Sequence, residues 1–334
     1  MSKFEKFRTY FEGKTVLVTG GAGFIGSNLS RALIEIGANV RVVDNLITGH
    51  LSNIADLLGE KLEFIEADIR DFKVCEKAMA GVDFISHQAA LGSVPRSMNE
   101  PLVSHDHNVN GTINILWAAY NANIKRVVMA SSSSVYGDEE TLPKTEERTG
   151  NLLSPYAATK GIGELYANTM NQAFGLEVVA LRYFNIYGPR QDPEGPYAAV
   201  IPKFIQMFQE GVSPIVYGDG EQSRDFTHVN NAIFANMAAM CNPDISGFNA
   251  INIACGARLT VNQLIHEIKA ALNSFGIETR GIEPTYADER PGDIRHSHAN
   301  IDKAEEILDY RVLMDVSEGI HNTVAWFIDE NCGQ

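Results

Sequence analysis

Short apolar runs alternate with longer amphipathic stretches along the first half of the chain. The runs are rich in β-branched residues and read TVLVTG, NVRVVD, LEFIEAD, VDFISHQA, RVVMASS and EVVALRYFN. Between them, stretches such as 25–36 and 109–121 repeat apolar residues at helical spacing. Continuous apolar strands separated by helices predict an α/β fold whose parallel sheet is covered by helices on both faces.

The pattern changes after Asn185. The next segment, IYGPRQDPEGP, is rich in Pro and Gly, which is typical of a loop. Helical patterns then occupy 200–210, 259–272, 303–308 and 316–330, and FNAINIA predicts one further buried strand that returns to the first sheet. We therefore expect a doubly wound parallel sheet in 1–185, with a return segment at about 225–256, and a smaller mixed α/β C-terminal lobe in 186–334.

Composition and charge narrow the classes of partner. The 334 residues are 45% hydrophobic and 21% charged, a profile typical of a soluble globular protein. The charged N-terminus has no apolar core, and the four cysteines lack disulfide or metal-ligand spacing, so we expect a reducing, cytoplasmic location and no metal. A net charge of −15 disfavours nucleic acid and anionic membranes as partners. It does not disfavour a small anionic ligand at a local positive site.

The first apolar run ends in a glycine turn. VLVTGGAGFIGSNL places Gly20, Gly23 and Gly26 between a predicted strand and a predicted helix. Glycine permits a tight turn and lets the backbone approach a pyrophosphate at the helix N-terminus. Asp44 ends the second strand, where a carboxylate accepts both ribose hydroxyls and repels a 2′-phosphate. These features predict a Rossmann-type domain that binds NAD rather than NADP; Arg41 lies within the strand and is expected to face elsewhere.

A tyrosine and a lysine stand four residues apart in SPYAATK. On a helix, Tyr156 and Lys160 share one face. A free tyrosine has a pKa of about 10, and lowering it by about three units takes about 4 kcal/mol, which a nearby ammonium and a positive nicotinamide ring could supply. The hydroxyl row Ser131 to Ser134 follows another strand, in MASSSSVYGDEE. Serine, tyrosine and lysine beside a dinucleotide predict dehydrogenase chemistry on an alcohol carbon, whereas a solvated loop is the alternative for the serines.

These motifs together resemble the extended short-chain dehydrogenase/reductase superfamily. TGGAGFIG, ADIRD, HQAA, NVNGT, SPYAATK and LRYFN stand in the family's order over residues 14 to 330. The segments QAALGSVPRS, PYAAVIPKF, GDGEQSRDF and RPGDIRHS are most similar to bacterial UDP-N-acetylhexosamine 4-epimerases of its NAD-dependent epimerase/dehydratase family. The resemblance assigns catalysis to Ser132, Tyr156 and Lys160. It also implies a homodimer that pairs through helices at 109–121 and 156–171.

The resemblance implies a set of residues that contact NAD. They are Gly20, Gly23, Phe24, Ile25, Asp44, Asn45, Thr48, Gly49, Asp68, Ile69, Gln88, Ala89, Ala90, His107, Tyr156, Lys160 and Phe184. Asp68 and Ile69 would hold the adenine, and Phe184 would lie near the nicotinamide. His107 departs from the asparagine or threonine of the relatives, which leaves its contact with NAD open.

A second implied set contacts the UDP-sugar. It comprises Ser132, Ser133, Ser134, Tyr156, Asn185, Ala199, Val200, Tyr217, Arg224, Arg290, Asp293 and Ser297. Asn185, Arg224 and Arg290 would hold the diphosphate, since guanidinium groups bind phosphate as forked donors. Ser297 matches a gate at the sugar end, where a small side chain leaves room for a 2-acetamido group.

The sequence favours epimerisation but leaves the sugar open. Dehydratases of the family carry Thr-Asp-Glu, and decarboxylases a glutamate, near the places of Ser133 and Ser134, where hydroxyls are poor acids and bases for elimination. We expect UDP-GlcNAc and UDP-GalNAc as substrates. The alternatives are UDP-GlcNAc uronic acid, for which Arg96 or His296 could bind the carboxylate, and UDP-glucose or UDP-glucuronate. A dehydratase, a decarboxylase and a non-catalytic NAD-binding protein rank behind them.

Overall fold

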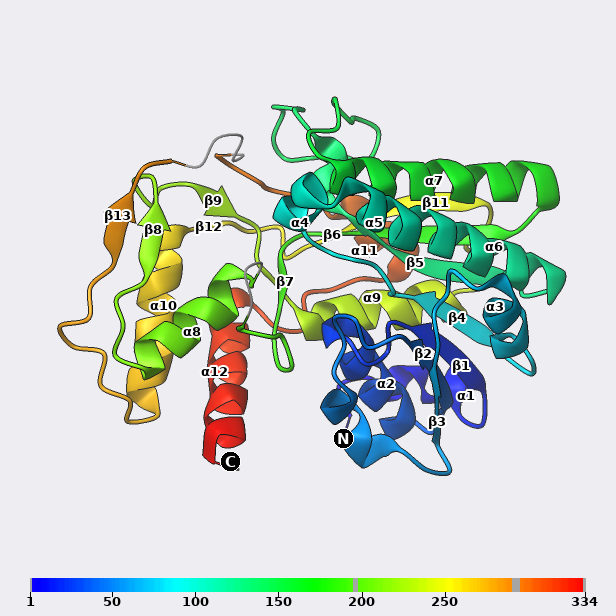
Figure 1. The fold of residues 1–334 in the computed structure, drawn as a ribbon, viewed down its shortest axis with the longest axis horizontal. Coiled ribbons are helices and arrows are strands. Elements are labelled where there is room, and N and C mark those ends of the chain that lie inside the picture. Colours follow the sequence, from blue (N-terminus) through cyan, green and yellow to red (C-terminus); the bar gives the residue numbers. More distant parts are fainter. Residues whose placement is uncertain (1, 195–197, 290–294, 333–334) are drawn as a thin grey trace.

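The computed structural model describes residues 2–194, 198–289 and 295–332 (Figure 1). Its strands are β1 (Thr15–Thr19), β2 (Asn39–Asp44), β3 (Leu62–Glu66), β4 (Phe84–His87), β5 (Arg126–Ser132), β6 (Glu177–Tyr183), β7 (Ile186–Tyr187), β8 (Ile215–Tyr217), β9 (Ser223–Arg224), β10 (Thr227–His228), β11 (Phe248–Ile253), β12 (Leu259–Thr260) and β13 (Thr285–Ala287). Its α-helices are α1 (Arg8–Phe11), α2 (Phe24–Glu35), α3 (Phe72–Ala78), α4 (Val94–Asn99), α5 (Pro101–His105), α6 (Gly111–Asn121), α7 (Pro155–Phe174), α8 (Val200–Gln209), α9 (Val229–Cys241), α10 (Val261–Ser274), α11 (Asp302–Leu308) and α12 (Val316–Cys332). Its shorter helical turns include the π-helical η4 (Asp106–Asn110) and the 3-10 turn η5 (Ser133–Tyr136).

A seven-stranded parallel sheet forms the larger part of the molecule. Its strand order is β11-β6-β5-β4-β1-β2-β3. The direction of winding reverses between β1 and β4, because β2 and β3 continue on one side of β1 and the later strands on the other. Ligands of open α/β sheets bind at the carboxyl ends of the strands beside such a reversal. The expected doubly wound parallel sheet is therefore confirmed.

Alternate residues of each strand enter two separate cores. Val16 and Val18 pack on one side, whereas Leu17 packs on the other. The first core is completed by apolar residues of α2, α9 and α11, and the second by residues of α3, α6 and α7. Figure 1 shows α6 and α7 on one side of the sheet and α2 with α9 on the other. Burial on both faces explains why the strands are continuously apolar in the sequence.

The second lobe is built on three helices. Apolar faces of α8, α10 and α12 meet in a third core, which includes Phe204, Ile268 and Val324. The short strand pair β8 and β13 lies beside these helices at the left of Figure 1. Helices predicted over 200–210, 259–272 and 316–330 are thus confirmed, with ends that differ by a few residues.

The chain crosses between the two parts more than once. β11 pairs in parallel with β6, which confirms the predicted returning strand. Farther along, residues 295–300 run beside β9 through a bridge between Ser223 and His296, and beside the 138–152 loop through a bridge between Lys144 and Ala299. These crossings join the lobes; the division into domains at residue 185 stays a prediction.

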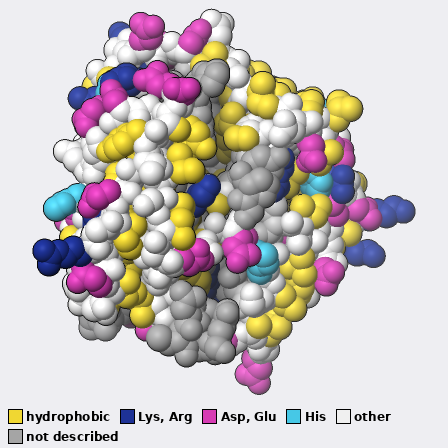
Figure 2. Space-filling view, turned by 60° about the vertical axis from the view of Figure 1, so that its left-hand side comes forward, with side chains coloured by type: hydrophobic (Ala, Val, Ile, Leu, Met, Phe, Trp, Pro, Cys, Tyr) yellow, Lys and Arg dark blue, Asp and Glu magenta, His cyan; other side chains and the backbone are white. Residues whose placement is uncertain are grey.

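The surface carries mixed charge. On the face shown in Figure 2, acidic side chains are scattered among basic ones on both sides of a central groove rather than gathered in one patch. None of the helices in the described ranges combines the length and the apolar character that a membrane crossing requires.

Candidate active site

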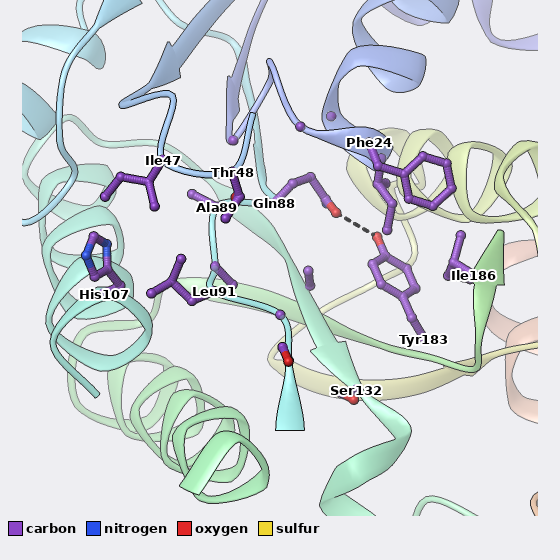
Figure 3. A pocket seen from close by; sticks show the side chains of 18 of the residues that line it. Phe24, Ile47, Thr48, Gln88, Ala89, Leu91, His107, Ser132, Tyr183 and Ile186 are labelled. Carbon is purple, nitrogen blue, oxygen red and sulfur yellow. Dashed lines mark hydrogen bonds between the residues drawn. The ribbon is translucent and has the colours of Figure 1, made fainter. Parts of the chain in front are cut away.

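A cavity of about 730 Å³ opens at the carboxyl ends of the central strands. Its walls come from the turn after β1, the ends of β2, β4 and β5, the start of α7, and the segment that follows β6. The predicted site residues that line it are Gly20, Gly23, Phe24, Ile25, Asp44, Asn45, Thr48, Ile69, Gln88, Ala89, Ala90, His107, Ser132, Ser133, Tyr156, Lys160, Asn185 and Ala199. Figure 3 shows several of these side chains directed into the cavity. The structure therefore places most of the predicted cofactor residues at one cavity, together with Ser132, Ser133, Tyr156, Asn185 and Ala199 of the predicted substrate set.

The glycine turn leaves no room for a side chain. Gly20 has a φ of +68°, and a Cβ there would lie 2.7 Å from the backbone N and Cα of Ala89. Gly23 precedes α2, and no side chain caps the first turn of that helix. The first N–H groups of α2 are thus left for an anion, as a pyrophosphate requires. This turn fits a dinucleotide.

Asp44 is fixed at the end of β2. Its side-chain oxygens accept hydrogen bonds from the backbone N–H of Ala22 at 3.0 Å and of Leu46 at 2.9 Å. A carboxylate oxygen accepts more than one hydrogen bond, so both oxygens can still receive ribose hydroxyls. Arg41 points away from the cavity and donates to the Glu63 carboxylate at 2.7 Å and to the Ala78 carbonyl. The expectation for Arg41 is confirmed, and no cation from this strand competes with Asp44.

Another part of the cavity wall, around His107, combines apolar and polar side chains. His107 lies in the π-helical turn η4 and faces the cavity near Leu91 and Ile47 (Figure 3). Burial, followed by the charge of Arg70, lowers the pKa of His107, so the imidazole is neutral at neutral pH. Asp68 does not line the cavity. Its carboxylate accepts hydrogen bonds from the side chains of Arg70 at 2.8 Å and Asn45 at 2.9 Å, and its predicted adenine contact stays a prediction.

The catalytic candidates meet where β5 ends and α7 begins. Ser132 is the last residue of β5, and its Oγ accepts the Ser134 backbone N–H at 3.1 Å. Ser154 caps α7 by accepting the Ala157 N–H, and Pro155 begins the helix, so Tyr156 lies in the first turn. Lys160 follows one turn later and donates from Nζ to the Ala130 carbonyl at 2.7 Å.

The protein's own groups do not ionise the tyrosine. Burial raises the pKa of the Tyr156 phenol, and a side-chain hydrogen bond with Ser132 lowers it by less. Burial also lowers the pKa of Lys160 to about 8. The lowered tyrosine pKa expected from the sequence depends on the nicotinamide charge as well as on Lys160, and it stays a prediction.

The four serines have four different surroundings. Ser131 donates its hydroxyl to Glu164 at 2.5 Å, and the Ser132 Oγ accepts the Ser134 N–H and lines the cavity beside Tyr156. Ser133 lines the cavity, whereas the Ser134 Oγ is buried, without a hydrogen-bond partner, outside the lining. The row is thus part of the site rather than a solvated loop. The sugar contact predicted for Ser134 stays a prediction.

Other predicted residues lie outside the cavity lining. Phe184 is fully buried and packs against Tyr136 at a ring-centroid distance of 5.9 Å. Gly49 lies behind the lining, next to the Asp44 carboxylate and the backbone of Gly23. The contacts with NAD predicted for Phe184 and Gly49 stay predictions.

The substrate candidates of the smaller lobe form a second group. Arg224 ends β9, and its guanidinium donates to the Arg295 carbonyl at 3.1 Å. The Ser297 N–H donates to the Ser223 carbonyl at 3.0 Å, so β9 and residues 295–297 lie side by side. Tyr217 ends β8, Val200 begins α8 directly after Ala199, and Arg290 and Asp293 fall outside the described residues.

Many lining residues fall outside the predicted site set, and Tyr183, Gln191 and Arg96 are three polar ones among them. Tyr183 donates to Gln88 at 3.2 Å (Figure 3), and nothing in the sequence separates it from the neighbouring strand residues. Gln191 lines the cavity with a buried Oε1 that has no hydrogen-bond partner. The third is Arg96, weighed only for a uronic acid. The sequence feature that could have indicated Gln191 is its place as a polar residue in the Pro- and Gly-rich loop that contains GPRQ.

Comparisons with known proteins agree with this geometry. The model of the NAD dependent epimerase/dehydratase family matches residues 16–254. A UDP-N-acetylglucosamine 4-epimerase from Methanobrevibacter ruminantium, solved in complex with UDP-N-acetylmuramic acid, is 42% identical, superposes with a TM-score of 0.89, and covers 96% of this chain and 100% of its own.

Two further relatives carry names with different activities. One from Methanocaldococcus jannaschii, named "Putative UDP-glucose 4-epimerase", is 40% identical over 318 residues, which are 95% of this chain and 99% of that protein. A UDP-N-acetyl-alpha-D-glucosaminuronate decarboxylase from Bacillus cytotoxicus is 33% identical over 325 residues, 94% and 98% of the two chains. The glycine turn, Asp44 and the family match establish NAD as the cofactor. The chain belongs to the NAD-dependent epimerase/dehydratase family of the extended short-chain dehydrogenases/reductases.

Proposed function

We propose that this protein is a 4-epimerase that interconverts UDP-GlcNAc and UDP-GalNAc. It would oxidise the sugar transiently at C4 and reduce it again on the other face. One observation carries the proposal: Tyr156, Ser132 and Lys160 border one cavity together with the glycine turn and Asp44. Proton transfer and dinucleotide binding thus meet in one site.

Tyr156, Ser132 and Lys160 have different roles in the proposed reaction. Tyr156 takes the proton of the C4 hydroxyl and later returns it, while Ser132 orients that hydroxyl. NAD, when bound, supplies the hydride acceptor and donor and a positive ring that favours the phenolate. Lys160 adds a second positive charge beside Tyr156, with its Nζ 6.0 Å from the phenol ring centroid.

The diphosphate is the proposed anchor. Asn185 lines the cavity, and its side chain donates to the Asp225 carbonyl at 3.0 Å, which fixes its orientation. Arg224 is proposed to bind the diphosphate from the smaller lobe. Binding energy at the nucleotide, remote from C4, would hold the oxidised sugar while it turns its other face.

The proposal also specifies that the substrate sugar carries a 2-acetamido group. Ser297 lies outside the cavity lining, and its backbone N–H donates to the Ser223 carbonyl. The proposal is that its small side chain leaves space for a 2-acetamido substituent at the sugar end. The 42%-identical relative acts on a UDP-N-acetyl sugar by its name, which supports the same choice. Plain hexoses, as in the M. jannaschii relative's name, remain the alternative for this position.

Elimination and decarboxylation are disfavoured by the serine row. Ser133 lines the cavity where relatives with those activities carry acids, and the Ser134 hydroxyl lies outside the lining. Hydroxyls orient a sugar but are poor acids and bases for breaking a C–O or C–C bond. The proposed reaction therefore ends at the re-reduced epimer.

A uronic acid is the second candidate, because Arg96 lines the cavity. A guanidinium there is suited to a carboxylate at C6. His296, the other cation considered, is instead held by Ser223, whose Oγ lies 2.8 Å from its Nδ1. The observation therefore favours Arg96 alone, and UDP-GlcNAc uronic acid is the substrate that would use it.

We also propose a homodimer through α6 and α7. Leu165 on α7 and Leu102 on α5 are 68% and 82% exposed, and Trp117 stacks on Tyr120 at 5.4 Å beside Phe174. Contiguous exposed apolar side chains of this kind mark protein interfaces. Leu165→Glu should shift the protein to monomer in sedimentation, whereas an unchanged sedimentation coefficient would exclude this face.

The direct test is a panel of UDP-sugars without added NAD, followed by chromatography and mass spectrometry. We expect UDP-GlcNAc and UDP-GalNAc to interconvert at constant mass. Loss of water or CO₂ would identify a dehydratase or decarboxylase. Turnover of UDP-GlcNAc uronic acid alone would identify the second candidate, and bound NAD without any turnover would identify a non-catalytic NAD-binding protein.

A further inference from the structure

A buried carboxylate lies one helical turn beyond the catalytic lysine. Glu164 is 9% exposed and faces the sheet from α7. Its Oε1 accepts the Ser131 hydroxyl at 2.5 Å and the Arg182 Nε at 3.0 Å, and its Oε2 accepts an Arg182 terminal nitrogen at 2.8 Å. This forked ion pair joins the catalytic helix to two neighbouring strands, β5 and β6.

Two hydrogen bonds tie α7 to the end of β5. Lys160 donates to the Ala130 carbonyl, and Glu164 accepts from the next residue, Ser131. Ser132, which lines the cavity with Tyr156 and lowers the pKa of its phenol, follows directly in the chain. The side chains that fix α7 against the end of β5 therefore stand one and two turns beyond Tyr156 along the helix.

Glu164 also affects the protonation of Lys160. Burial lowers the pKa of Lys160 to about 8, and the charge of Glu164 raises it. His87, on the facing strand β4, is fully buried with a pKa of about 3, and is therefore neutral. The charged and titratable groups on the far side of Glu164 include Arg182, the Tyr136 phenol behind it, and Glu146, whose carbonyl accepts from Arg182 at 3.0 Å.

We propose that Glu164 is a positioning residue that keeps Lys160 protonated and holds Ser131, and hence Ser132, against Tyr156. Without the carboxylate, the buried ammonium loses the negative charge that raises its pKa, and it releases its proton at lower pH. Tyr156 then loses a cation that favours the phenolate. The inference rests on the catalytic roles proposed for Tyr156 and Lys160, but not on the identity of the sugar.

The test compares two halves of one ion pair in the NAD-containing enzyme. Turnover is measured against pH for the wild type, Glu164→Gln and Arg182→Gln. In the wild type, turnover falls above about pH 8, where Lys160 loses its charge. In Glu164→Gln, the fall should begin at least about one pH unit lower, as expected when a nearby charge is removed.

Arg182→Gln is the matched control. It breaks the same ion pair and should lower the melting temperature to a similar degree, but it leaves the carboxylate, so the alkaline fall should stay at the wild-type pH or move higher. A merely structural role of Glu164 would give both variants the same pH profile. That outcome would overturn the inference.

A third variant separates misfolding from the charge effect. Glu164→Gln combined with Arg182→Gln leaves no unpaired guanidinium in the interior, and it should show the alkaline fall of Glu164→Gln alone. Tyrosinate absorbance, with Tyr156→Phe subtracted, should show a higher tyrosine pKa in both variants that lack the carboxylate; an unshifted tyrosine would overturn the inference. If Tyr156→Phe keeps its activity, the proposed function fails. If Tyr156→Phe is inactive but Glu164→Gln and Arg182→Gln have the same pH profile, only the inference about Glu164 fails.

Discussion

The two sides of the cavity are built in different ways. On the cofactor side, the ends of adjacent strands β1, β2 and β4 present the glycine turn, Asp44 and Gln88 along one edge of a single sheet. On the proposed substrate side, Asn185 lines the cavity, whereas Arg224 and Ser297 lie outside its lining on two segments that are distant in sequence. They meet only through pairings such as Ser297 with Ser223.

This difference suggests where change is tolerated. The cofactor side is constrained by backbone: a Cβ at Gly20 has no space, and both Asp44 oxygens already accept backbone hydrogen bonds. The substrate side depends on side chains whose size and charge can vary without disturbing a strand. We therefore expect substitutions on the cofactor side to affect NAD content, and those on the substrate side to affect the choice of sugar.

The largest effect is expected where the two sides meet. Tyr156→Phe removes the hydroxyl that accepts and returns the proton, so turnover of UDP-GlcNAc should fall about 1,000-fold or more. Bound NAD, measured after denaturation, should stay at the wild-type level. Turnover close to the wild type would remove Tyr156 from the reaction.

On the substrate side, Ser297→Tyr should close the space for the acetamido group. UDP-GlcNAc turnover should fall about 100-fold, while UDP-galactose turnover changes little, since the obstruction concerns one substituent. Ser297→Ala keeps the side chain small and should spare both sugars. An equal loss on both sugars in the tyrosine variant would contradict the gate.

On the cofactor side, Gly20→Ala should release NAD. The new Cβ would press on the Ala89 backbone and force a left-handed residue, at a cost of about 1–3 kcal/mol in unfolding free energy. Gly13→Ala is the control, because Gly13 has a similar φ of +72° but open space around its Cβ. It should lower the melting temperature and leave NAD content unchanged; equal NAD loss would show that the close approach is irrelevant.

The smallest effect concerns the choice of dinucleotide. Asp44→Ala should weaken the preference for NAD over NADP in binding titrations, because the carboxylate repels a 2′-phosphate. Arg41→Ala should leave the preference unchanged, since Arg41 is engaged by Glu63 outside the cavity. A preference that shifts with Arg41 rather than Asp44 would reverse the assignment.

The sequence was most informative about the cofactor side. Strand alternation, the glycine turn and Asp44 are local patterns, and a parallel sheet brings the carboxyl ends of its strands to one edge. By contrast, the roles of Ser131 and Phe184 depend on what packs behind the strands. Nothing local shows that Ser131 bonds Glu164 or that Phe184 turns into a core with Tyr136.

The electrostatics were also beyond the sequence. A lysine and a nicotinamide ring beside a tyrosine predict a lowered phenol pKa, but the sequence does not show that burial raises the pKa of this phenol. Burial depends on the whole surrounding fold. On the substrate side, the pairing of residues 295–297 with β9 joins segments about seventy residues apart, a contact that helical and strand periodicity cannot reveal.

The most direct test follows the hydrogen on C4. UDP-GlcNAc that carries deuterium at C4 should give UDP-GalNAc with the deuterium still on C4, without exchange into water and without dilution by added unlabelled NADH, because the hydride leaves and returns within one closed site. Deuterium that appears in the solvent, or a product that loses its label to free cofactor, would contradict the account.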